Sequence, residues 1–378
     1  FPYTTLFRSH YVGTVLAVRG KGGKSRSVPV RDDVAGAVLR YLSDAFKALR
    51  SGVPAAARTD LTPIFSFNSQ GLWVPGAPNL GADLTDLIIR MAGSGEAVEG
   101  YGKAAIVGTG GDMVGTVNIS TMAAIVVASM GIPVMKHGSR SASGKTGSSE
   151  MLEVLGVRLD LSPERVADIF REVGITFFFA PVFHPAMRHV GPIRKELGVP
   201  TTFNFLGPLA NPAQPIATSL GVSNPYIAPL MAAEMAARGR SALVFRGSDG
   251  LDELTTTGTS QIWQVSGGEV REFELDPRKF GLKIVAIEEL IGGGAQENAE
   301  VARQLFDGNQ AGNLAAVRDI VILNAAGGVV SYELAKDASR SELDLDLRFE
   351  SAITRVSEAL DNGSAAAKLS HWITATQQ

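Results

Sequence analysis

The sequence predicts an α/β fold in which a mainly parallel sheet is covered by helices. From about residue 83, short buried strands alternate with helices, as they do in parallel sheets with helical crossovers. Apolar residues make up 45% of the 378 residues, which is enough for a large buried core. A chain of this length exceeds the size at which one core stops growing, so we expect at least two domains.

The N-terminal part of the chain follows a different pattern. Residues 1–10, FPYTTLFRSH, show no periodicity and are typical of a cloning or assembly scar. Residues 11–30 hold two β-rich runs around a Gly/Lys turn, which predicts a hairpin. Residues 31–50 place apolar side chains at helical spacing behind an acidic start, and residues 51–81 have the Pro, Gly and Ser content of a linker.

The elements of the remaining chain are predicted from apolar runs between turn signals. Strands are expected at 104–112, 132–138, 175–180 and 241–247, and a hairpin at 261–275 with Gly267 and Gly268 in its turn. Helices are expected at 83–95, 121–131, 149–156, 162–174, 184–198 and 225–239, and again through most of 295–373.

The composition excludes several kinds of site. The chain has no cysteine, so it forms neither disulfides nor thiolate metal sites, and we expect a reducing, cytoplasmic setting. Its five histidines lack the H-x-x-x-H spacing typical of zinc, whereas hard cations bound by oxygen atoms remain compatible. No window reaches the roughly 18 uninterrupted apolar residues of a membrane span, so we expect no membrane partner.

The net charge of −3 is distributed unevenly. Residues 8–50 hold nine Lys or Arg against three Asp or Glu, a balance of +6, so the remainder carries −9. A nucleic-acid-binding segment is one interpretation, but its binding would be non-specific and sensitive to salt. We therefore expect no specific nucleic-acid partner.

A glycine-rich loop, GTGGDMVGTVNIST at 108–121, follows a predicted strand and precedes a predicted helix. Its backbone N–H groups and the helix N-terminus form an anion site that needs no basic side chain. Asn118 or Ser120 is expected to cap that helix. The spacing is neither G-x-G-x-x-G nor a P-loop, so by itself the loop is equally consistent with a plain strand-to-helix turn.

A cationic, hydroxyl-rich loop follows the next strand, in the run KHGSRSASGKTGSSEMLEVLG at 136–156. Its simplest interpretation is a solvated basic turn. However, loops after parallel strands emerge at one end of the sheet, where ligands of such folds bind. The two loops are therefore expected to face one crevice, with Lys136, Arg140, Ser143 and Ser148 facing a polyanion such as a diphosphate.

Two further segments carry polar side chains. The turn GSDGLDELTTTGT at 247–259 contains Asp249, Asp252 and Glu253, which suit an ordinary acidic turn or Mg²⁺ bound together with substrate phosphates. The segment 177–212 mixes a core strand with His184 and Arg194, and its NFLGPLANP end is typical of an interdomain connection.

These motifs together resemble one family. GTGGD…NIST, KHG-R, APVFHPAMRHVGPIRKELGVPTTFNFLGPLANP and GLDELTTTG occur in the order and spacing of anthranilate phosphoribosyltransferases, over about residues 85–376. The resemblance implies a phosphoribosyltransferase-like α/β domain with a smaller helical domain. It also implies the substrates 5-phosphoribosyl 1-diphosphate and anthranilate, Mg²⁺, a homodimer, and a cytoplasmic step of tryptophan biosynthesis.

The resemblance also implies roles for individual residues. The phosphoribosyl donor would be bound by Gly108, Gly111, Asp112, Thr116, Asn118, Ile119, Ser120, Thr121, Lys136, His137, Gly138, Arg140, Ser143 and Ser148. The metal would be bound by Ser120, Asp252 and Glu253, and anthranilate by Gly108, Ser139, His184 and Arg194.

The chain departs from the family pattern in two places. Ser139 stands where the family has Asn, and Gly144 where it has a second Ser. The N-terminal helices that build the family's small domain are not recognisable, so that domain is expected to be incomplete. Residues 11–82 resemble the middle of a tyrosine recombinase domain instead, with Lys21 at its hairpin lysine. The chain is thus interpreted as three parts: 1–10, the recombinase-like 11–82, and the transferase-like 83–378.

The predicted reaction is displacement at the anomeric carbon of the ribose, with diphosphate leaving as positive charge develops on the sugar. Loop donors and Mg²⁺ would stabilise the leaving charge. The arylamine carries a free lone pair, so no general base is assigned. Alternatives are a pyrimidine nucleoside phosphorylase-like enzyme, a phosphoribosyltransferase with another amine acceptor, or an inactive chimera.

Overall fold

A computed structural model describes residues 103–112, 114–140, 146–184 and 203–378, with the backbone of five short strands before them. The chain divides into two compact units, residues 1–93 with 184–210, and residues 94–183 with 211–378. The predicted helices at 31–50, 83–95 and 184–198 lie outside the described residues. The break at Ala210 falls inside the segment expected to connect domains.

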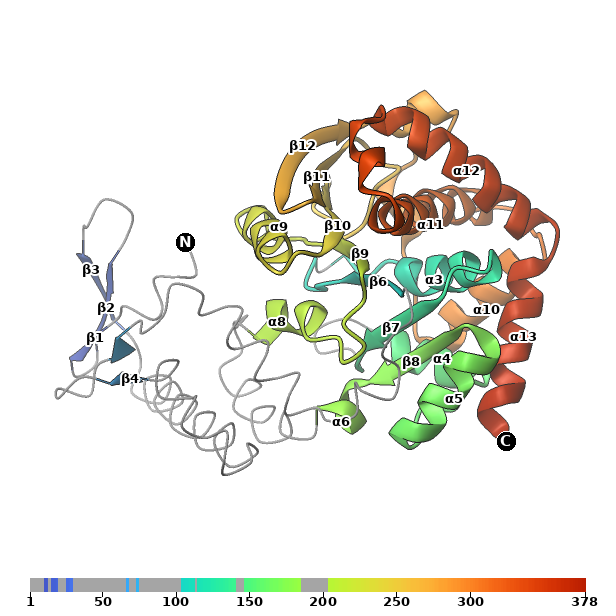
Figure 1. Cartoon of the computed structure of the whole chain (residues 1–378), viewed down its shortest axis with the longest axis horizontal. Coiled ribbons are helices and arrows are strands. Elements are labelled where there is room, and N and C mark those ends of the chain that lie inside the picture. The colour runs from blue at the N-terminus through green and yellow to red at the C-terminus, as the bar shows by residue number, and fades with distance from the viewer. Residues whose placement is uncertain are drawn as a thin grey trace. The chain divides into compact units, whose positions relative to one another are not determined.

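The second unit is built on a seven-stranded sheet of order β12-β11-β10-β9-β6-β7-β8 (Figure 1). Strands β10, β9, β6, β7 and β8 are parallel to their neighbours, and β11 and β12 extend the sheet in antiparallel fashion. The strands are β6 (Ala104–Gly108), β7 (Val134–Gly138), β8 (Ile175–Phe179), β9 (Ala217–Gly221), β10 (Ser241–Gly247), β11 (Ser260–Ser266) and β12 (Glu269–Leu275). The prediction of a mainly parallel sheet is confirmed.

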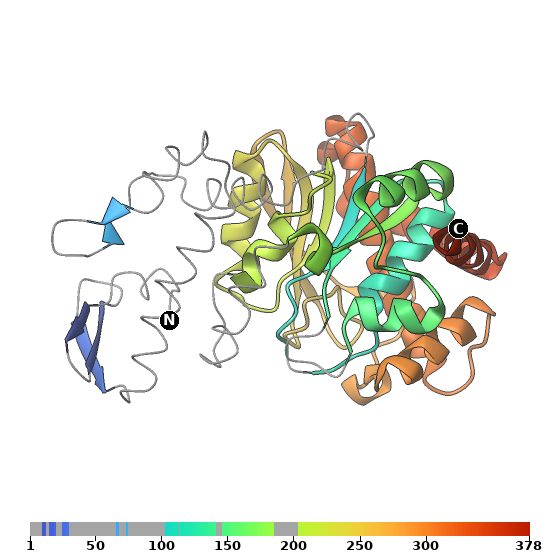
Figure 2. The same cartoon turned by 90° about the horizontal axis from the view of Figure 1, so that it is seen from below.

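Helices cover both faces of this sheet (Figure 2). Helices α3 (Ile119–Ser129) and α11 (Leu314–Lys336) pack on one face and on each other, and α9 (Ala228–Ala237) packs across β10, β11 and β12 on the other. The remaining helices of this unit are α4 (Ser148–Leu155), α5 (Pro163–Val173), the short α6 (Ala180–Phe183), α10 (Ala295–Phe306), α12 (Leu345–Asp361) and α13 (Ser364–Gln377). Short 3-10 turns occupy Pro277–Phe280, Ile287–Leu290 and Ala338–Glu342.

Local sequence signals account for several of these boundaries. Ser162 caps α5 by accepting a hydrogen bond from the Arg165 amide, and Pro163 occupies the first turn, where its missing N–H costs nothing. Gly267 and Gly268 both adopt positive φ, as a tight β11–β12 hairpin requires. The predicted hairpin is therefore confirmed.

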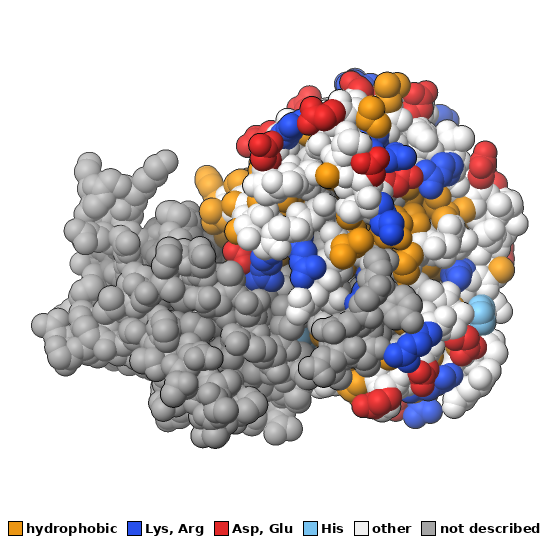
Figure 3. Space-filling view, in the orientation of Figure 1, with side chains coloured by type: hydrophobic (Ala, Val, Ile, Leu, Met, Phe, Trp, Pro, Cys, Tyr) orange, Lys and Arg blue, Asp and Glu red, His pale blue; other side chains and the backbone are white. Residues whose placement is uncertain are grey.

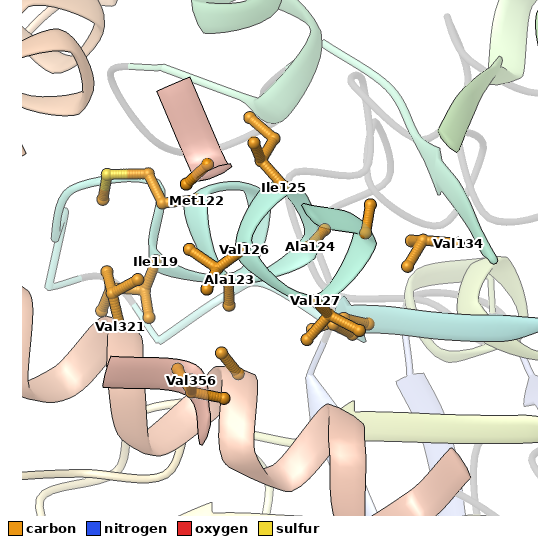
Figure 4. Close-up of a cluster of buried hydrophobic side chains, with 14 of the residues drawn as sticks. Ile119, Met122, Ala123, Ala124, Ile125, Val126, Val127, Val134, Val321 and Val356 are labelled. Atoms are coloured by element: carbon orange, nitrogen blue, oxygen red, sulfur yellow. The ribbon is translucent and has the colours of Figure 1, made fainter. Parts of the chain in front are cut away.

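The core lies between the sheet and the α3–α11 layer. Ile119, Met122 and Val126 of α3 are buried together with Val321 of α11 and Val356 of α12 (Figure 4). Helix α11 is the one described helix long and apolar enough to pass a membrane-span test, with a mean hydropathy of 1.5 over its best window. However, 83% of that window is buried inside the protein, which is typical of a core helix.

The surface of the described part carries charges of both signs. Figure 3 shows Lys and Arg interspersed with Asp and Glu on one face. Several of them are paired, for example Arg318 with Asp361 at 2.8 Å and Arg340 with Glu333 at 2.8 Å. These pairs are partly exposed, and ion pairs at the protein surface each contribute at most about 1 kcal/mol.

The first unit contains two small sheets. Strands β1 (His10–Val12), β2 (Val15–Arg19) and β3 (Ser25–Pro29) form an antiparallel sheet, and β4 (Ser66–Phe67) pairs with β5 (Trp73–Val74). The β2–β3 pairing confirms the hairpin predicted within 11–30. Helix α8 (Phe203–Leu209) also belongs to this unit.

Candidate active site

The candidate site lies at the carboxyl edge of the parallel strands. Chain order reverses between β6 and β9, because β7 and β8 continue on one side of β6 while β10 follows β9 on the other. Such a switch point is where open α/β sheets bind their ligands. Strands β6, β9 and β10 end in Gly108, Gly221 and Gly247, and the polar loops follow directly.

Glycine at the ends of β6 and β9 lets Asp252 approach the sheet. Gly108 and Gly221 are paired across the two strands. A Cβ atom on Gly108 would overlap the Asp252 carboxylate, and one on Gly221 would overlap the Asp252 backbone carbonyl. Asp252 therefore lies over the switch point because neither strand end carries a side chain.

The acidic pair is bound by backbone amides of the glycine-rich loop and helix α3. The amide of Gly110 donates to Asp252 Oδ2 at 2.6 Å, and the amide of Ser120 donates to Glu253 Oε1 at 3.2 Å. Both carboxylates are 8% exposed. These bonds join segments that are far apart in the sequence.

Lys136 of β7 reaches the same place from the other side. Its side chain is 2% exposed, and Nζ donates to the Ile106 carbonyl at 3.1 Å and to Ser120 Oγ at 3.3 Å. Ser120 thus connects the cation to the acidic pair, through its hydroxyl on one side and its amide on the other.

Burial dominates the electrostatics of this cluster. It lowers the pKa of Lys136, although the charges of Glu253 and Asp252 oppose the effect. Burial also raises the pKa of Asp252, and the nearby Asp112 charge adds to that rise. The pKa of Glu253 is raised mainly by burial and next by the Asp252 charge. Two buried carboxyl groups side by side therefore disfavour double ionisation unless a cation is added.

Asn118 brings the two predicted loops together. It occupies the N-cap position of α3, but its side chain forms no capping bond, so the capping role predicted for it is wrong. Its Nδ2 donates instead to the Thr146 carbonyl in the cationic loop, at 3.4 Å. Its Oδ1 accepts from Asn298 at 2.9 Å. The glycine-rich loop and the cationic loop are therefore in contact at Thr146, and the crevice predicted between them stays a prediction.

The third acid of the turn has a local role. Asp249 Oδ2 accepts from the Thr255 and Thr257 hydroxyls, each at 2.6 Å, and Oδ1 accepts from the Leu251 amide at 3.0 Å. All these partners belong to the same turn as Asp249. Asp249 therefore shapes the turn rather than binding a distant loop.

The other residues of the predicted glycine-loop set differ in their exposure. Gly111 is exposed, and Asp112 and Thr116 are partly buried, with Asp112 Oδ1 accepting from the Val114 amide at 3.2 Å. The side chains of Ile119 and Thr121 are buried. Ligand contact through those two residues would have to involve their backbone.

The predicted residues of the cationic loop separate into two groups. His137 is buried, and Gly138 and Ser148 are partly buried. Ser139 and Arg140 are exposed, and Arg140 donates to Glu153 Oε1 at 3.0 Å. Ser143 lies outside the described residues.

Of the remaining anthranilate set, Arg194 lies outside the described residues. His184 is buried, and burial lowers its pKa to about 4.

The sequence patterns missed Asn324 of α11, which is fully buried and supports the acidic pair. Its Oδ1 accepts from the Leu254 amide at 2.9 Å and its Nδ2 donates to the Leu254 carbonyl at 2.8 Å. A polar residue inside an apolar helical run was the available signal.

Within the described residues, no three His, Asp or Glu side chains converge on one point as a protein-only metal site would need. The candidate metal ligands are the two buried carboxylates of Asp252 and Glu253 and the hydroxyl of Ser120. All are oxygen atoms, and Mg²⁺ prefers one or two carboxylates completed by substrate phosphates and water. The residues present therefore fit magnesium bound together with a phosphorylated ligand.

Known proteins resemble this chain over most of its length. Residues 101–366 match the family described as "Glycosyl transferase family, a/b domain". The chain is 53% identical to the anthranilate phosphoribosyltransferase of Leifsonia xyli subsp. xyli over 272 residues, which cover 72% of this chain and 77% of that protein. It is 50% identical to the enzyme of Nocardia farcinica over 267 residues, covering 71% and 76% of the two chains.

Solved structures give the same result. The anthranilate phosphoribosyltransferase of Thermus thermophilus has a TM-score of 0.71 at 36% identity, covering 92% of this chain and all of that one. The enzyme of Saccharomyces cerevisiae in complex with PRPP and Mg has a TM-score of 0.66 at 26% identity, covering 90% and 98%. With its switch-point site and its relatives at about half identity, the chain belongs to the anthranilate phosphoribosyltransferase family of glycosyl transferases.

Proposed function

We propose that the switch-point cluster carries out the reaction of this family in tryptophan biosynthesis. The phosphoribosyl group passes from 5-phosphoribosyl 1-diphosphate to the amine of anthranilate, giving N-(5-phosphoribosyl)anthranilate and diphosphate. One observation carries the assignment: Gly110, Ser120, Lys136, Asp252 and Glu253 form one network at the sheet edge. The network joins the glycine-rich loop, the cationic strand end and the acidic turn.

The diphosphate end of the donor would lie against the two loops. The backbone amides of the glycine-rich loop and the N-terminus of α3 supply anion-binding donors. The positive charge of Lys136 would stabilise the leaving diphosphate. Because Lys136 is buried and held by two hydrogen bonds, it would need little reorganisation as negative charge develops on the diphosphate. Ser143 and Ser148 would add hydroxyl contacts, as the family resemblance implies.

Asp252 and Glu253, with the Ser120 hydroxyl, are proposed to hold Mg²⁺. Burial raises the pKa of both carboxyls, and a divalent cation would restore their charged form. When bound, the metal would neutralise charge on the departing diphosphate. The yeast relative in complex with PRPP and Mg supports this proposal.

The acceptor site is proposed on the residues that the resemblance implies, namely Gly108, Ser139, His184 and Arg194. The aromatic amine has a free lone pair at neutral pH, so positioning replaces strong general-base catalysis. The residues that hold anthranilate therefore act mainly by orienting its nitrogen toward the anomeric carbon.

Two further proposals rest on the family resemblance, and a third rests on the separate resemblance of residues 11–82 to a tyrosine recombinase domain. The protein forms a homodimer, which light scattering on the purified chain would measure. It acts in the cytoplasm. Residues 11–82, with the scar-like 1–10, form a recombinase-like part that is separate from the transferase region 83–378.

The reaction is tested by following anthranilate fluorescence in the presence of 5-phosphoribosyl 1-diphosphate and Mg²⁺. Fluorescence should fall only when enzyme, donor and metal are all present, with one diphosphate released for each anthranilate consumed. Omission of each component is the control. Phosphorolysis of a pyrimidine nucleoside without anthranilate consumption would assign the site to the phosphorylase alternative instead.

A further inference from the structure

The glycine-rich loop and the cationic loop, which are proposed to bind the phosphoribosyl donor, are called the donor loops below. A second layer of residues lies behind them, at the start of α10. The segment from Leu290 to Asn298 runs alongside the glycine-rich loop. The Leu290 carbonyl accepts from the Val117 amide at 3.0 Å, and the Gly292 amide donates to the Gly115 carbonyl at 2.9 Å. Neither the family motifs nor the reaction assigns a role to this segment.

Asn298 is the polar centre of this layer. It is 2% exposed, and its Nδ2 donates to Asn118 Oδ1 at 2.9 Å. Its Oδ1 accepts from the Gly293 amide at 2.8 Å. Because Asn298 Oδ1 is engaged by Gly293, its NH₂ group faces Asn118, and the Asn118 amide must then present its own NH₂ group to Thr146.

The same segment also contacts the cationic loop directly. Thr146 Oγ1 donates to the Gly293 carbonyl at 3.0 Å. Gly293 is therefore bonded to Asn298 through its N–H and to Thr146 through its carbonyl. A closed ring of hydrogen bonds links Asn118, Thr146, Gly293 and Asn298.

Close packing keeps this ring rigid. A Cβ atom on Gly292 would lie 2.6 Å from Asn298 Oδ1 and 2.9 Å from the Val117 amide nitrogen. No side chain fits there without moving the ring or the loop backbone. The glycine is required for the close approach of α10 to the donor loop.

We propose that Asn298 is a positioning residue for the phosphoribosyl donor, acting through Asn118 and Thr146. It holds the two donor loops at a fixed separation before the ligand arrives, so that binding costs less ordering of the loops. The proposal rests on the proposed function, because it assumes that these loops bind the donor. It adds a residue 180 positions away from Asn118 to the donor site.

The test compares Asn298→Asp and Asn298→Ala with the parent enzyme. The aspartate keeps an acceptor for the Gly293 amide but has no N–H for Asn118 Oδ1. We expect the KM for 5-phosphoribosyl 1-diphosphate to rise about ten-fold in both variants, with the KM for anthranilate nearly unchanged. The midpoint of thermal unfolding without ligand is measured alongside.

Thr376→Val is the matched control. Thr376 is 2% exposed and accepts from the Arg158 amide at 3.1 Å in a bond between α13 and the loop before α5. This variant removes two partly buried hydrogen bonds away from the donor loops, the one from the Arg158 amide and the one that the Thr376 hydroxyl donates to the Ile373 carbonyl at 2.8 Å. It should lower the unfolding midpoint while leaving both KM values as in the parent.

Coupling to Asn118 distinguishes positioning from general destabilisation. If Asn298 acts through Asn118, Asn118→Ala and Asn298→Ala together should raise the donor KM much less than the product of their separate effects. An unchanged donor KM in Asn298→Asp, or independent effects in the double variant, would overturn the proposal.

A direct binding measurement keeps this test separate from that of the reaction. Calorimetric titration of the parent with the donor and Mg²⁺ gives a donor Kd even if no anthranilate is consumed. Binding without turnover would reject the proposed acceptor, and Asn298→Asp should then weaken the donor Kd by the same factor of about ten. Absence of donor binding by the parent would reject both proposals.

Discussion

Two parts of one acidic turn behave differently in this protein. Asp249 forms its hydrogen bonds with Leu251, Thr255 and Thr257, all within the turn. Asp252 and Glu253, only a few residues later, accept from the amides of Gly110 in the glycine-rich loop and Ser120 in helix α3. Asp249 therefore stabilises the turn itself, whereas Asp252 and Glu253 form part of the candidate site.

The difference lies in burial and in the origin of the partners. Asp249 is exposed and its partners are groups close in sequence. The pair Asp252 and Glu253 is buried, and burial raises the pKa of both carboxyl groups. A buried carboxylate held by distant amides is costly to maintain, which is a feature of functional sites.

The largest effect should come from removing the charge of the buried pair. Asp252→Asn combined with Glu253→Gln keeps the shape but removes the charge proposed to bind Mg²⁺. Turnover should fall by at least about 100-fold, because the charge on the leaving diphosphate is no longer offset. Steady-state kinetics over a range of Mg²⁺ concentrations would measure it.

Asp249→Asn is the matched control for that change. It weakens the bonds to Thr255 and Thr257, so the unfolding free energy should fall by about 1 kcal/mol, with turnover within a few-fold of the parent. If Asp249→Asn lowered turnover as much as the Asp252→Asn and Glu253→Gln double variant, Asp249 would belong to the active site as much as the buried pair does.

A second large effect should follow from removing the support behind the acidic pair. Asn324→Leu fills a similar volume but leaves the Leu254 amide and carbonyl without their partners. The unfolding free energy should fall by about 3 kcal/mol, and turnover should also fall because Glu253 precedes Leu254 directly. Denaturant unfolding and kinetics on the same samples would check both. A loss of stability with unchanged turnover would show that Asn324 supports the fold alone.

His184 extends the contrast to a buried group that is neutral in the folded protein. Its pKa is lowered from 6.5 to about 4. The folded state therefore binds fewer protons than the unfolded state between these values. The resulting stability is complete above pH 6.5 and is lost as the pH falls toward 4, by about 3 kcal/mol.

His184→Gln should remove this part of the pH dependence. The unfolding free energies of the parent and the variant are measured at intervals from about pH 7 down to about pH 4, and their difference is taken. That difference should change by the amount stated above. A constant difference would mean that His184 titrates normally in the folded protein.

The smallest effect is expected at an exposed position of the cationic loop. By the family resemblance, Ser139 stands where an asparagine is expected, and its side chain is shorter and has a single O–H. Ser139→Asn should lower the KM for anthranilate about five-fold, since one neutral hydrogen bond contributes about 1 kcal/mol, and leave the donor KM unchanged. If the substitution abolishes turnover, or if another amine outcompetes anthranilate in the parent, Ser139 belongs to a different acceptor site.

Most elements are predictable because their apolar runs are regular. Strands β7, β8 and β10, the β11–β12 hairpin and the C-terminal helices all appear where periodicity and turn residues predict them, whereas β6 ends at Gly108, four residues before the predicted end at residue 112. Strand β9 escapes such patterns. Its sequence ATSLG contains Thr218 and Ser219, yet every residue in it is buried. Small polar residues fit there because α11 brings Gly327 close to Ser219, a contact that local patterns do not contain.

The candidate site divides in the same way. Local sequence patterns are sufficient to show which loops carry amides, cations and acids, because strand-to-helix alternation places all of them at one edge of the sheet. They also identify Lys136 and the acidic pair as candidates. They do not distinguish Asp249 from Asp252, because an ordinary acidic turn and a metal-binding turn have the same composition and spacing of acidic residues.

The partners that these side chains meet depend on the packing of the whole chain. Asn118 lies at the start of a helix, where its sequence position predicts a cap, but its amide group bonds to Thr146 and Asn298 instead. Asp252 lies on two glycine strand ends that are neighbours only after β9 has paired with β6. The physical reason is common to both cases: a buried polar group takes whatever donor or acceptor the packed chain brings near it, and sequence distance does not limit that choice.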